Sequence, residues 1–138
     1  MKKLAEHFSL PELVGTSHKE LEAENIYYAL DRFNELVILA QFCEKVREIL
    51  GVPMNITSAV RCPKLNTKVG GTSNSDHIKL MAVDFVPSRI KLRTAFDKIA
   101  NSTLHYKQLI LEKNTWIHIS IGDKRENLIY DGKKYKRV

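Results

Sequence analysis

The stretches SDHIKLMAVD (residues 75–84) and WIHIS (residues 116–120) decide how this sequence is interpreted. In the first stretch, His77 and Asp84 are seven residues apart, across an expected turn that leads into a β-favouring segment. In the second stretch, isoleucines alternate with other residues. Because successive side chains point to opposite faces of a strand, His118 lies on the face away from the isoleucines. The isoleucines are left for the core, and a polar ligand is expected on the side of His118.

Two imidazoles and one carboxylate form a ligand set that a catalytic zinc ion can use, with the fourth position left to water. A structural zinc site would more typically use four protein ligands. Taken singly, however, His77 and Asp84 are more typical of a solvated loop histidine and a turn or strand-end aspartate. The spacing alone therefore raises a metal site as a hypothesis and leaves this plainer interpretation open.

Helical patterns precede and separate these stretches. Ser9-Leu10-Pro11-Glu12 reads as a capping box with proline in the first turn, which predicts a short helix. From residue 25 to residue 50, apolar positions recur every three or four residues, and Gly51 and Pro53 follow. This periodicity predicts one long amphipathic helix over residues 25–50, and a further helix is expected over residues 92–100.

Short β-favouring stretches bounded by turn residues predict strands over residues 54–58, 81–86, 109–112 and 116–121. The pair Asp131-Gly132 lies between apolar segments near the C-terminus and predicts a β-hairpin over residues 127–138. The predicted fold class is therefore α+β, with a small antiparallel sheet packed against helices.

The chain has 138 residues, of which 43% are hydrophobic, and it shows no internal repeat or linker. It is expected to form a single domain over residues 1–138, with its motifs in residues 54–122. Cys43 and Cys62 are too few for a disulfide scaffold and are expected to be small buried hydrophobes. No run approaches the roughly 18 apolar residues of a membrane-spanning helix, so no membrane insertion is expected. Glu6 and His7 interrupt the N-terminal segment, so no signal peptide is expected and synthesis should be cytoplasmic.

The formal net charge of +6 favours anionic surfaces, including nucleic acid, membrane and acidic cell-wall polymer. A basic nucleic-acid-binding module is one alternative, suggested by the C-terminal cluster Lys133, Lys134, Lys136 and Arg137. Such a run is more typical of a solvated tail, and no nucleic-acid motif accompanies it. No nucleic-acid partner is therefore expected.

Several motifs follow one another in a particular order: Ser-x-x-Arg-x-Pro at residues 58–63, Leu-Asn at 65–66, Val-Gly-Gly at 69–71, then the two stretches quoted first. In this order they resemble the zinc peptidases of the D-alanyl-D-alanine carboxypeptidase family, whose architecture is similar to the hedgehog signalling domain. The segment FSLPEL at residues 8–13 is also similar to the opening of many members. The resemblance covers residues 8 to about 122.

The resemblance implies that His77, Asp84 and His118 bind Zn²⁺. It also implies a general base on the preceding strand, six residues before the last histidine in one branch of the family, which is Glu112 here. The branch that places the base three residues before that histidine would put it at Thr115, which cannot accept the proton. A plain solvated charge at a strand end is the alternative for Glu112.

The same resemblance assigns further residues to the cleft. Arg61 is expected to stabilise the carbonyl oxygen or to bind a substrate carboxylate, because a guanidinium offers a planar fork of donors. Ser75 and Asp76 could orient His77 or simply form the turn, and Ser75 is counted with the substrate-binding residues. Trp116 is expected to line the cleft, with a place in the core as its alternative.

The implied reaction is metal-assisted hydrolysis of peptidoglycan stem peptides, at D-Ala-D-Ala or L-Ala-D-Glu bonds, by a monomer. Without a signal peptide or wall-binding repeat, the chain looks like a phage or prophage endolysin that is released to the cell wall. Two departures keep an alternative open: the family usually has glycine where this chain has Leu80, and an aromatic residue where it has Val60. The alternative is a weak or inactive zinc-binding domain that serves as a binding or structural module.

Overall fold

The computed structural model describes residues 3–138 and confirms the α+β class. Its helices are α1 (Leu10–Val14), the 3-10 helix η1 (Lys19–Leu21), α2 (Glu22–Leu30), α3 (Phe33–Leu50), α4 (Pro63–Lys68) and α5 (Leu92–Ala100). Its strands are β1 (Lys3–Ala5), β2 (Phe8–Ser9), β3 (Met54–Ser58), β4 (Ala82–Pro87), β5 (Gln108–Glu112), β6 (Trp116–Ser120), β7 (Glu126–Tyr130) and β8 (Tyr135–Arg137). Within this range, no helix combines the length and the apolar content needed to cross a bilayer.

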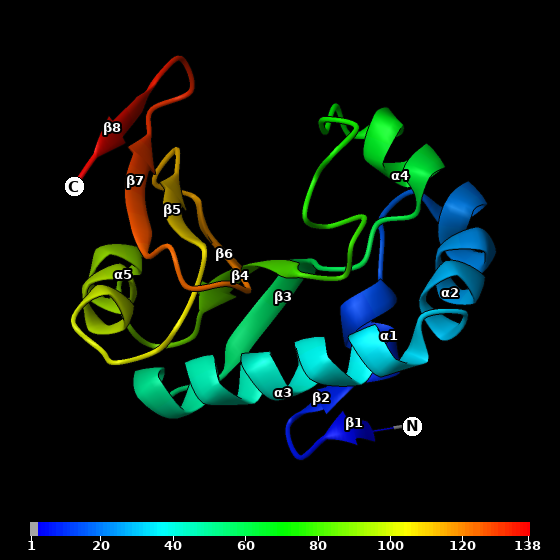
Figure 1. Ribbon diagram of the computed structural model, residues 1–138, viewed down its shortest axis with the longest axis horizontal. Coiled ribbons are helices and arrows are strands. Elements are labelled where there is room, and N and C mark those ends of the chain that lie inside the picture. Colours follow the sequence, from blue (N-terminus) through cyan, green and yellow to red (C-terminus); the bar gives the residue numbers. More distant parts are fainter. Residues whose placement is uncertain (1–2) are drawn as a thin grey trace.

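The main sheet has six strands in the order β3-β4-β6-β5-β7-β8, and β1 and β2 form a separate two-stranded antiparallel sheet. Neighbouring strands of the main sheet are antiparallel, except for the parallel pair β5 and β7. The larger sheet is therefore mixed. Helix α3 runs along one side of the molecule, and α5 lies near the same side of the strands (Figure 1).

One face of the main sheet forms the core. The inward residues of β4 and β6, Val83, Phe85, Ile117 and Ile119, are fully buried and belong to the same cluster as the buried residues of α3 and α5. Each such side chain stabilises the fold by about 1.5–3 kcal/mol. The alternation of side chains then leaves the opposite sheet face to the polar residues. His118 lies on that opposite face, as its strand pattern predicts.

The single helix predicted over residues 25–50 is wrong: the structure has two helices, and the chain turns between Leu30 and Phe33. Leu30 and Phe33 both belong to the apolar pattern of the predicted helix, but they are 40% and 44% exposed. The Arg32 guanidinium lies 3.7 Å over the Tyr28 ring and donates a hydrogen bond to the Tyr28 carbonyl at the end of α2. This contact lies at the break, and no glycine or proline lies between the two helices, so the apolar spacing runs through the break unchanged.

Several local predictions are confirmed. The Glu12 carboxylate accepts a hydrogen bond from the backbone N–H of Ser9, and helix α1 begins at the next residue. Helix α5 has the predicted bounds, and the C-terminal hairpin forms between β7 and β8. The sequence did not indicate the small β1–β2 sheet or α4, although Pro63 occupies the first turn of α4, where proline is tolerated.

Cys43 and Cys62 are buried and unpaired within residues 3–138, as predicted. Burial raises the pKa of the Cys43 thiol, since the thiolate would lose its hydration. The Cys43 thiol therefore stays protonated and acts as a small apolar side chain.

Candidate metal centre

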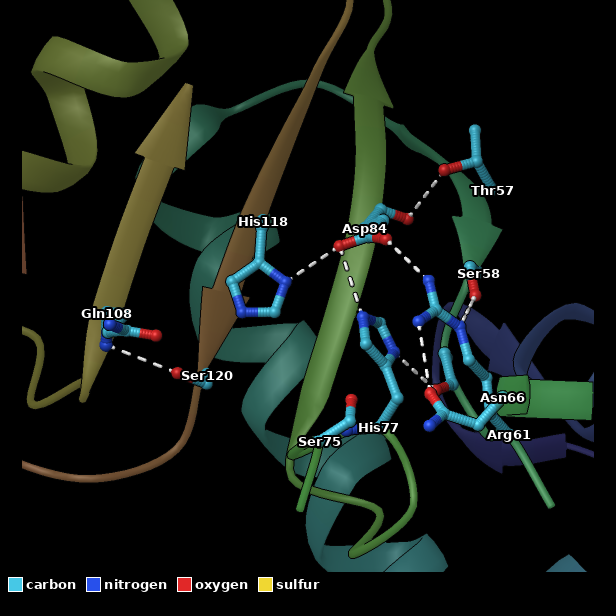
Figure 2. Close-up of polar contacts among 11 residues, drawn as sticks. Thr57, Ser58, Arg61, Asn66, Ser75, His77, Asp84, Gln108, His118 and Ser120 are labelled. Carbon is cyan, nitrogen blue, oxygen red and sulfur yellow. Dashed lines mark hydrogen bonds and ion pairs between the residues drawn. The ribbon is translucent and has the colours of Figure 1, made fainter. Parts of the chain in front are cut away.

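The open face of the main sheet carries two of the three predicted metal ligands on neighbouring strands. Asp84 of β4 pairs directly with His118 of β6, so their side chains emerge side by side. His118 Nδ1 lies 2.8 Å from Asp84 Oδ1 (Figure 2). Asp84 is almost fully buried, and His118 is partly exposed to the cleft. The antiparallel register of the two strands thus creates this half of the centre.

His77 joins them from the loop between α4 and β4. Its backbone carbonyl accepts a hydrogen bond from the Arg61 N–H at 3.3 Å, and its ring Nδ1 lies 2.7 Å from the Ala59 carbonyl oxygen. A carbonyl oxygen only accepts, so Nδ1 carries the proton and Nε2 of the neutral ring keeps a lone pair. That Nε2 lies 3.3 Å from Asp84 Oδ1. The segment that follows β3 therefore fixes both the place and the tautomer of His77.

The three side chains fit a metal ion by the chemistry of their donors. One nitrogen from each of His77 and His118 and one oxygen of Asp84 lie within 4.8 Å of one another. With neutral rings, lone pairs of His77 and Asp84 face each other, and only protonation or a cation between them resolves the repulsion. Two imidazoles and one carboxylate form a usual ligand set of catalytic zinc, which leaves a position for a reactant.

The charge on Asp84 is stabilised by its surroundings. Burial by itself raises the pKa of this carboxyl, but a hydrogen bond from His118 and, when both ring nitrogens of His77 carry protons, one from His77 outweigh burial and hold its pKa well below the usual range. Arg61 Nη2 lies 3.3 Å from the second oxygen, Asp84 Oδ2. Asp84 is therefore an anion held in place by contacts to both oxygens, as a metal-ligating carboxylate should be.

Arg61 is itself held in a fixed orientation. Its Nε donates to Ser58 Oγ at 3.0 Å, and its Nη1 lies 3.5 Å from Asn66 Oδ1 (Figure 2). Asn66 in turn donates from Nδ2 to the Thr72 carbonyl at 2.7 Å. Burial lowers the pKa of Arg61, and the nearby Asp84 carboxylate opposes that effect. The guanidinium thus links Asp84 to Asn66, and Asn66 in turn holds the loop that follows α4.

Glu112 ends β5 on the same sheet face, directly opposite Trp116 of β6. Its side chain is partly buried, and this burial raises the pKa of the carboxyl, because the ionised form loses hydration. Glu112 lines a cleft of about 460 Å³ together with all three predicted metal ligands. A carboxylate with a raised pKa beside a metal centre suits a group that accepts and returns a proton.

A comparison with protein families gives a family model of peptidase M15 that matches residues 7–120. The chain belongs to the peptidase M15 family. No curated protein matches the chain in a sequence comparison. M15 peptidases are zinc-dependent metallopeptidases, and the cluster of His77, Asp84 and His118 is the possible metal-binding group of this member.

The cleft of this M15 member also receives the other residues that the sequence assigned to it. Ser75 and Trp116 line it, as do Arg61 and Glu112. Ser75 Oγ accepts a hydrogen bond from the backbone N–H of His77 at 3.2 Å, which supports the turn that carries the ligand. The Trp116 indole N–H is buried and has no hydrogen-bond partner among residues 3–138. The fold thus brings the four residues, which come from four separate segments of the chain, to one cleft.

Leu80 and Val60, the two departures from the family pattern, have clear structural places. Leu80 has a φ of 57°, in the left-handed region that favours glycine, and its side chain is 1% exposed. A non-glycine residue in this region costs on the order of 1–2 kcal/mol, which burial of a leucine side chain offsets. Val60 is also buried in the core. Both residues therefore belong to the buried core, and the three predicted ligands still lie together.

Sequence reasoning missed Asn25, which shapes the site from behind. This fully buried residue of α2 donates from Nδ2 to the carbonyls of Val14 and Val60, at 2.9 and 3.0 Å. Its Oδ1 accepts a hydrogen bond from the backbone N–H of Cys62 at 2.7 Å. Asn25 therefore forms hydrogen bonds with the backbone on both sides of Arg61. An asparagine on the apolar face of a predicted helix was the available signal.

Proposed function

We propose that this protein is a zinc-dependent peptidase that hydrolyses the stem peptides of peptidoglycan. The observation that carries the proposal is the convergence of Glu112 and Arg61 on the cleft that holds His77, Asp84 and His118. A metal-binding group alone would also suit a structural role. A partly buried carboxylate that can exchange a proton and an oriented guanidinium that can stabilise an oxyanion instead favour hydrolysis of an amide bond.

A zinc ion bound there would supply Lewis-acid polarisation of the scissile carbonyl and lower the pKa of water. Glu112 then serves as the general base: it accepts the proton of the attacking water and returns it to the leaving amine. Because burial raises the pKa of Glu112, hydrolysis should fall as the pH decreases through that raised value. The acid limb of the kcat/KM profile measures this, and it should lie above the ordinary glutamate value of 4.5.

Arg61 supports the same reaction with the donors that it has left. A guanidinium carries five N–H groups, and the contacts to Ser58, Asn66 and Asp84 use three of them. The other two are available to an oxygen of the substrate, either the developing oxyanion or a carboxylate. The fixed orientation of the side chain keeps the reorganisation cost of that contact small.

The substrate class follows from family and charge. The D-alanyl-D-alanine carboxypeptidase resemblance favours a D-Ala-D-Ala or an L-Ala-D-Glu bond, and the net charge of +6 favours an anionic polymer such as the bacterial wall. In this proposal the protein acts at the cell wall, as an endolysin of a phage or prophage would. An inactive zinc-binding module is the competing function.

A digest of purified peptidoglycan tests the proposal. The zinc-loaded protein should release stem-peptide fragments, and mass spectrometry of the products identifies the bond that is cut. Loss of a terminal D-alanine would assign a carboxypeptidase, and released peptides that begin at D-Glu would assign an L-Ala-D-Glu endopeptidase. Absence of any product from peptidoglycan and from D-Ala-D-Ala and L-Ala-D-Glu peptides, with zinc fully bound, would favour the inactive module instead.

A further inference from the structure

A row of side chains crosses the open face of the sheet beyond the metal centre. Trp116 of β6 pairs with Glu112 of β5, Glu112 with Tyr130 of β7, and Tyr130 with Tyr135 of β8. Partners in register project from the same face of a sheet. The four side chains therefore form one continuous row, which leads from the predicted general base to the outermost strand.

The outer half of this row lies beyond the family match. The family model ends at residue 120, whereas β7 and β8 span residues 126–137. Tyr135 nevertheless lines the same cleft as the metal ligands, and its side chain is 56% exposed. Figure 1 shows this hairpin beside β5, at the far end of the sheet from β3. A segment outside the residues that the family model matches thus adds a wall to the cleft.

The hairpin presents Tyr135 in a defined position. The Tyr130 and Tyr135 rings stack with centroids 4.5 Å apart and an interplanar angle of 28°. In the turn, Asp131 accepts hydrogen bonds from the backbone N–H groups of Lys133 and Lys134, at 2.8 and 2.9 Å. Gly132 takes the φ of 103° that the turn needs. The exposed face of Tyr135 is therefore prearranged, which reduces the entropy that a bound ligand would have to pay.

The distance from the metal centre fixes which part of a substrate can reach this face. Tyr135 lies three strand spacings from β6, about 14 Å, and two residues further along the strands than His118, about 7 Å. The two backbones are thus roughly 16 Å apart, and an extended peptide spans about 3.4 Å per residue. A dipeptide held at the metal spans only about 7 Å, whereas the four stem residues on one side of the scissile bond span about 14 Å and can meet the Tyr135 side chain, which lines the cleft.

We propose that Tyr135, stacked on Tyr130, forms a subsite that binds the substrate peptide about three to four residues from the scissile bond. The inference rests on the proposed peptidase function and adds a preference for extended substrates. An aromatic face suits this task because it packs against apolar side chains and peptide planes alike.

The test compares two substrates that contain the bond identified in the peptidoglycan digest: the isolated dipeptide and the full stem pentapeptide. In the parent protein, kcat/KM should be higher for the pentapeptide. Tyr135→Ala should reduce the ratio of the two kcat/KM values by about three- to tenfold, mainly through KM. Tyr135→Phe keeps the ring and should retain the ratio. Tyr27→Ala, which removes a tyrosine that is 69% exposed on α2, is the matched control.

A second readout does not depend on turnover. Trp116 is the single tryptophan of the chain and lies in the cleft, so its fluorescence reports peptide binding. In a Glu112→Gln background, Tyr135→Ala should weaken pentapeptide binding by a similar factor. If the parent cleaves both substrates and Tyr135→Ala changes neither the ratio nor the Kd, the subsite is refuted and the peptidase function stands. If the parent neither binds nor cleaves either peptide, both proposals fail together.

Discussion

Arg61 lies between a predicted metal ligand and the open cleft. It contacts Asp84 Oδ2 on one side and faces the cleft on the other, while Ser58 and Asn66 fix its orientation. The side-chain hydrogen bonds and ion pairs of Arg61 in the described part of the chain go to Ser58, Asn66 and Asp84, and none goes to His77 or His118. Its expected effect is therefore on the reaction rather than on whether zinc binds.

Arg61→Ala should keep zinc content near that of the parent and lower kcat/KM on a stem peptide by roughly 10² to 10³, the range for one lost oxyanion donor. Arg61→Lys should restore only part of the rate, since an ammonium lacks the planar fork. Steady-state kinetics and elemental analysis measure the two effects. Arg93→Ala, at an exposed site on α5, is the control. An unchanged rate in Arg61→Ala would remove this residue from the reaction.

At the residue scale, the alternation of side chains along a strand and the order of the motifs predicted where the site residues lie. His118 is on the open sheet face because its isoleucine neighbours occupy the core, and simple alternation gives this result. The contact of His77 with the Ala59 carbonyl could not be predicted, because it joins two loops whose approach depends on the whole fold. Leu80 was noted as a departure, but its left-handed φ and its burial appear only in the structure.

At the element scale, the sequence did not predict α2 as a separate helix or its contacts with the segment around Arg61. The apolar periodicity continues from α2 into α3, so the sequence predicts one helix, whereas the structure has two, with the contacts of Arg32 and Tyr28 at the turn between them. The separation allows α2 to turn Asn25 toward the segment that carries Arg61. Periodicity reports which residues are apolar, but it does not report a change of helix direction.

Asn25→Ala should destabilise the protein by about 3 kcal/mol, because two buried carbonyls and one buried N–H lose their partner. Asn25→Asp keeps the acceptor for Cys62 but places a carboxylate against two carbonyl oxygens, so it should also destabilise. Urea unfolding with a common m-value measures both changes. Asn34→Ala, at an exposed position of α3, is the control. A loss below about 1 kcal/mol would mean that the segment around Arg61 is held by other contacts.

At the scale of the whole molecule, the metal centre joins parts that are distant in sequence. His77 belongs to the loop after α4, Asp84 to β4 and His118 to β6, and the cleft continues to β8. An ion that binds only the folded protein adds its binding free energy to stability. The fold and the zinc site should therefore be thermodynamically coupled.

Removal of zinc with a chelator should lower Tm, and zinc at about 100 times its Kd should restore about 2.7 kcal/mol. The parent protein should contain about one equivalent of zinc by elemental analysis. His77→Ala and His118→Ala should each lose the metal and the Tm response, whereas His105→Ala, at an exposed loop residue, should keep both. Full zinc content in His77→Ala and His118→Ala would mean that the site is assigned wrongly.

The most direct test of a catalytic metal centre is the hydrolysis rate of a stem peptide by zinc-loaded parent and Glu112→Gln proteins. Glutamine keeps the size and shape of Glu112 but cannot accept the proton of water. The rate should fall by roughly 10² or more while zinc content stays the same. Equal rates in the two proteins, or no hydrolysis by the zinc-loaded parent, would contradict the assignment of Glu112 as the general base of a peptidase.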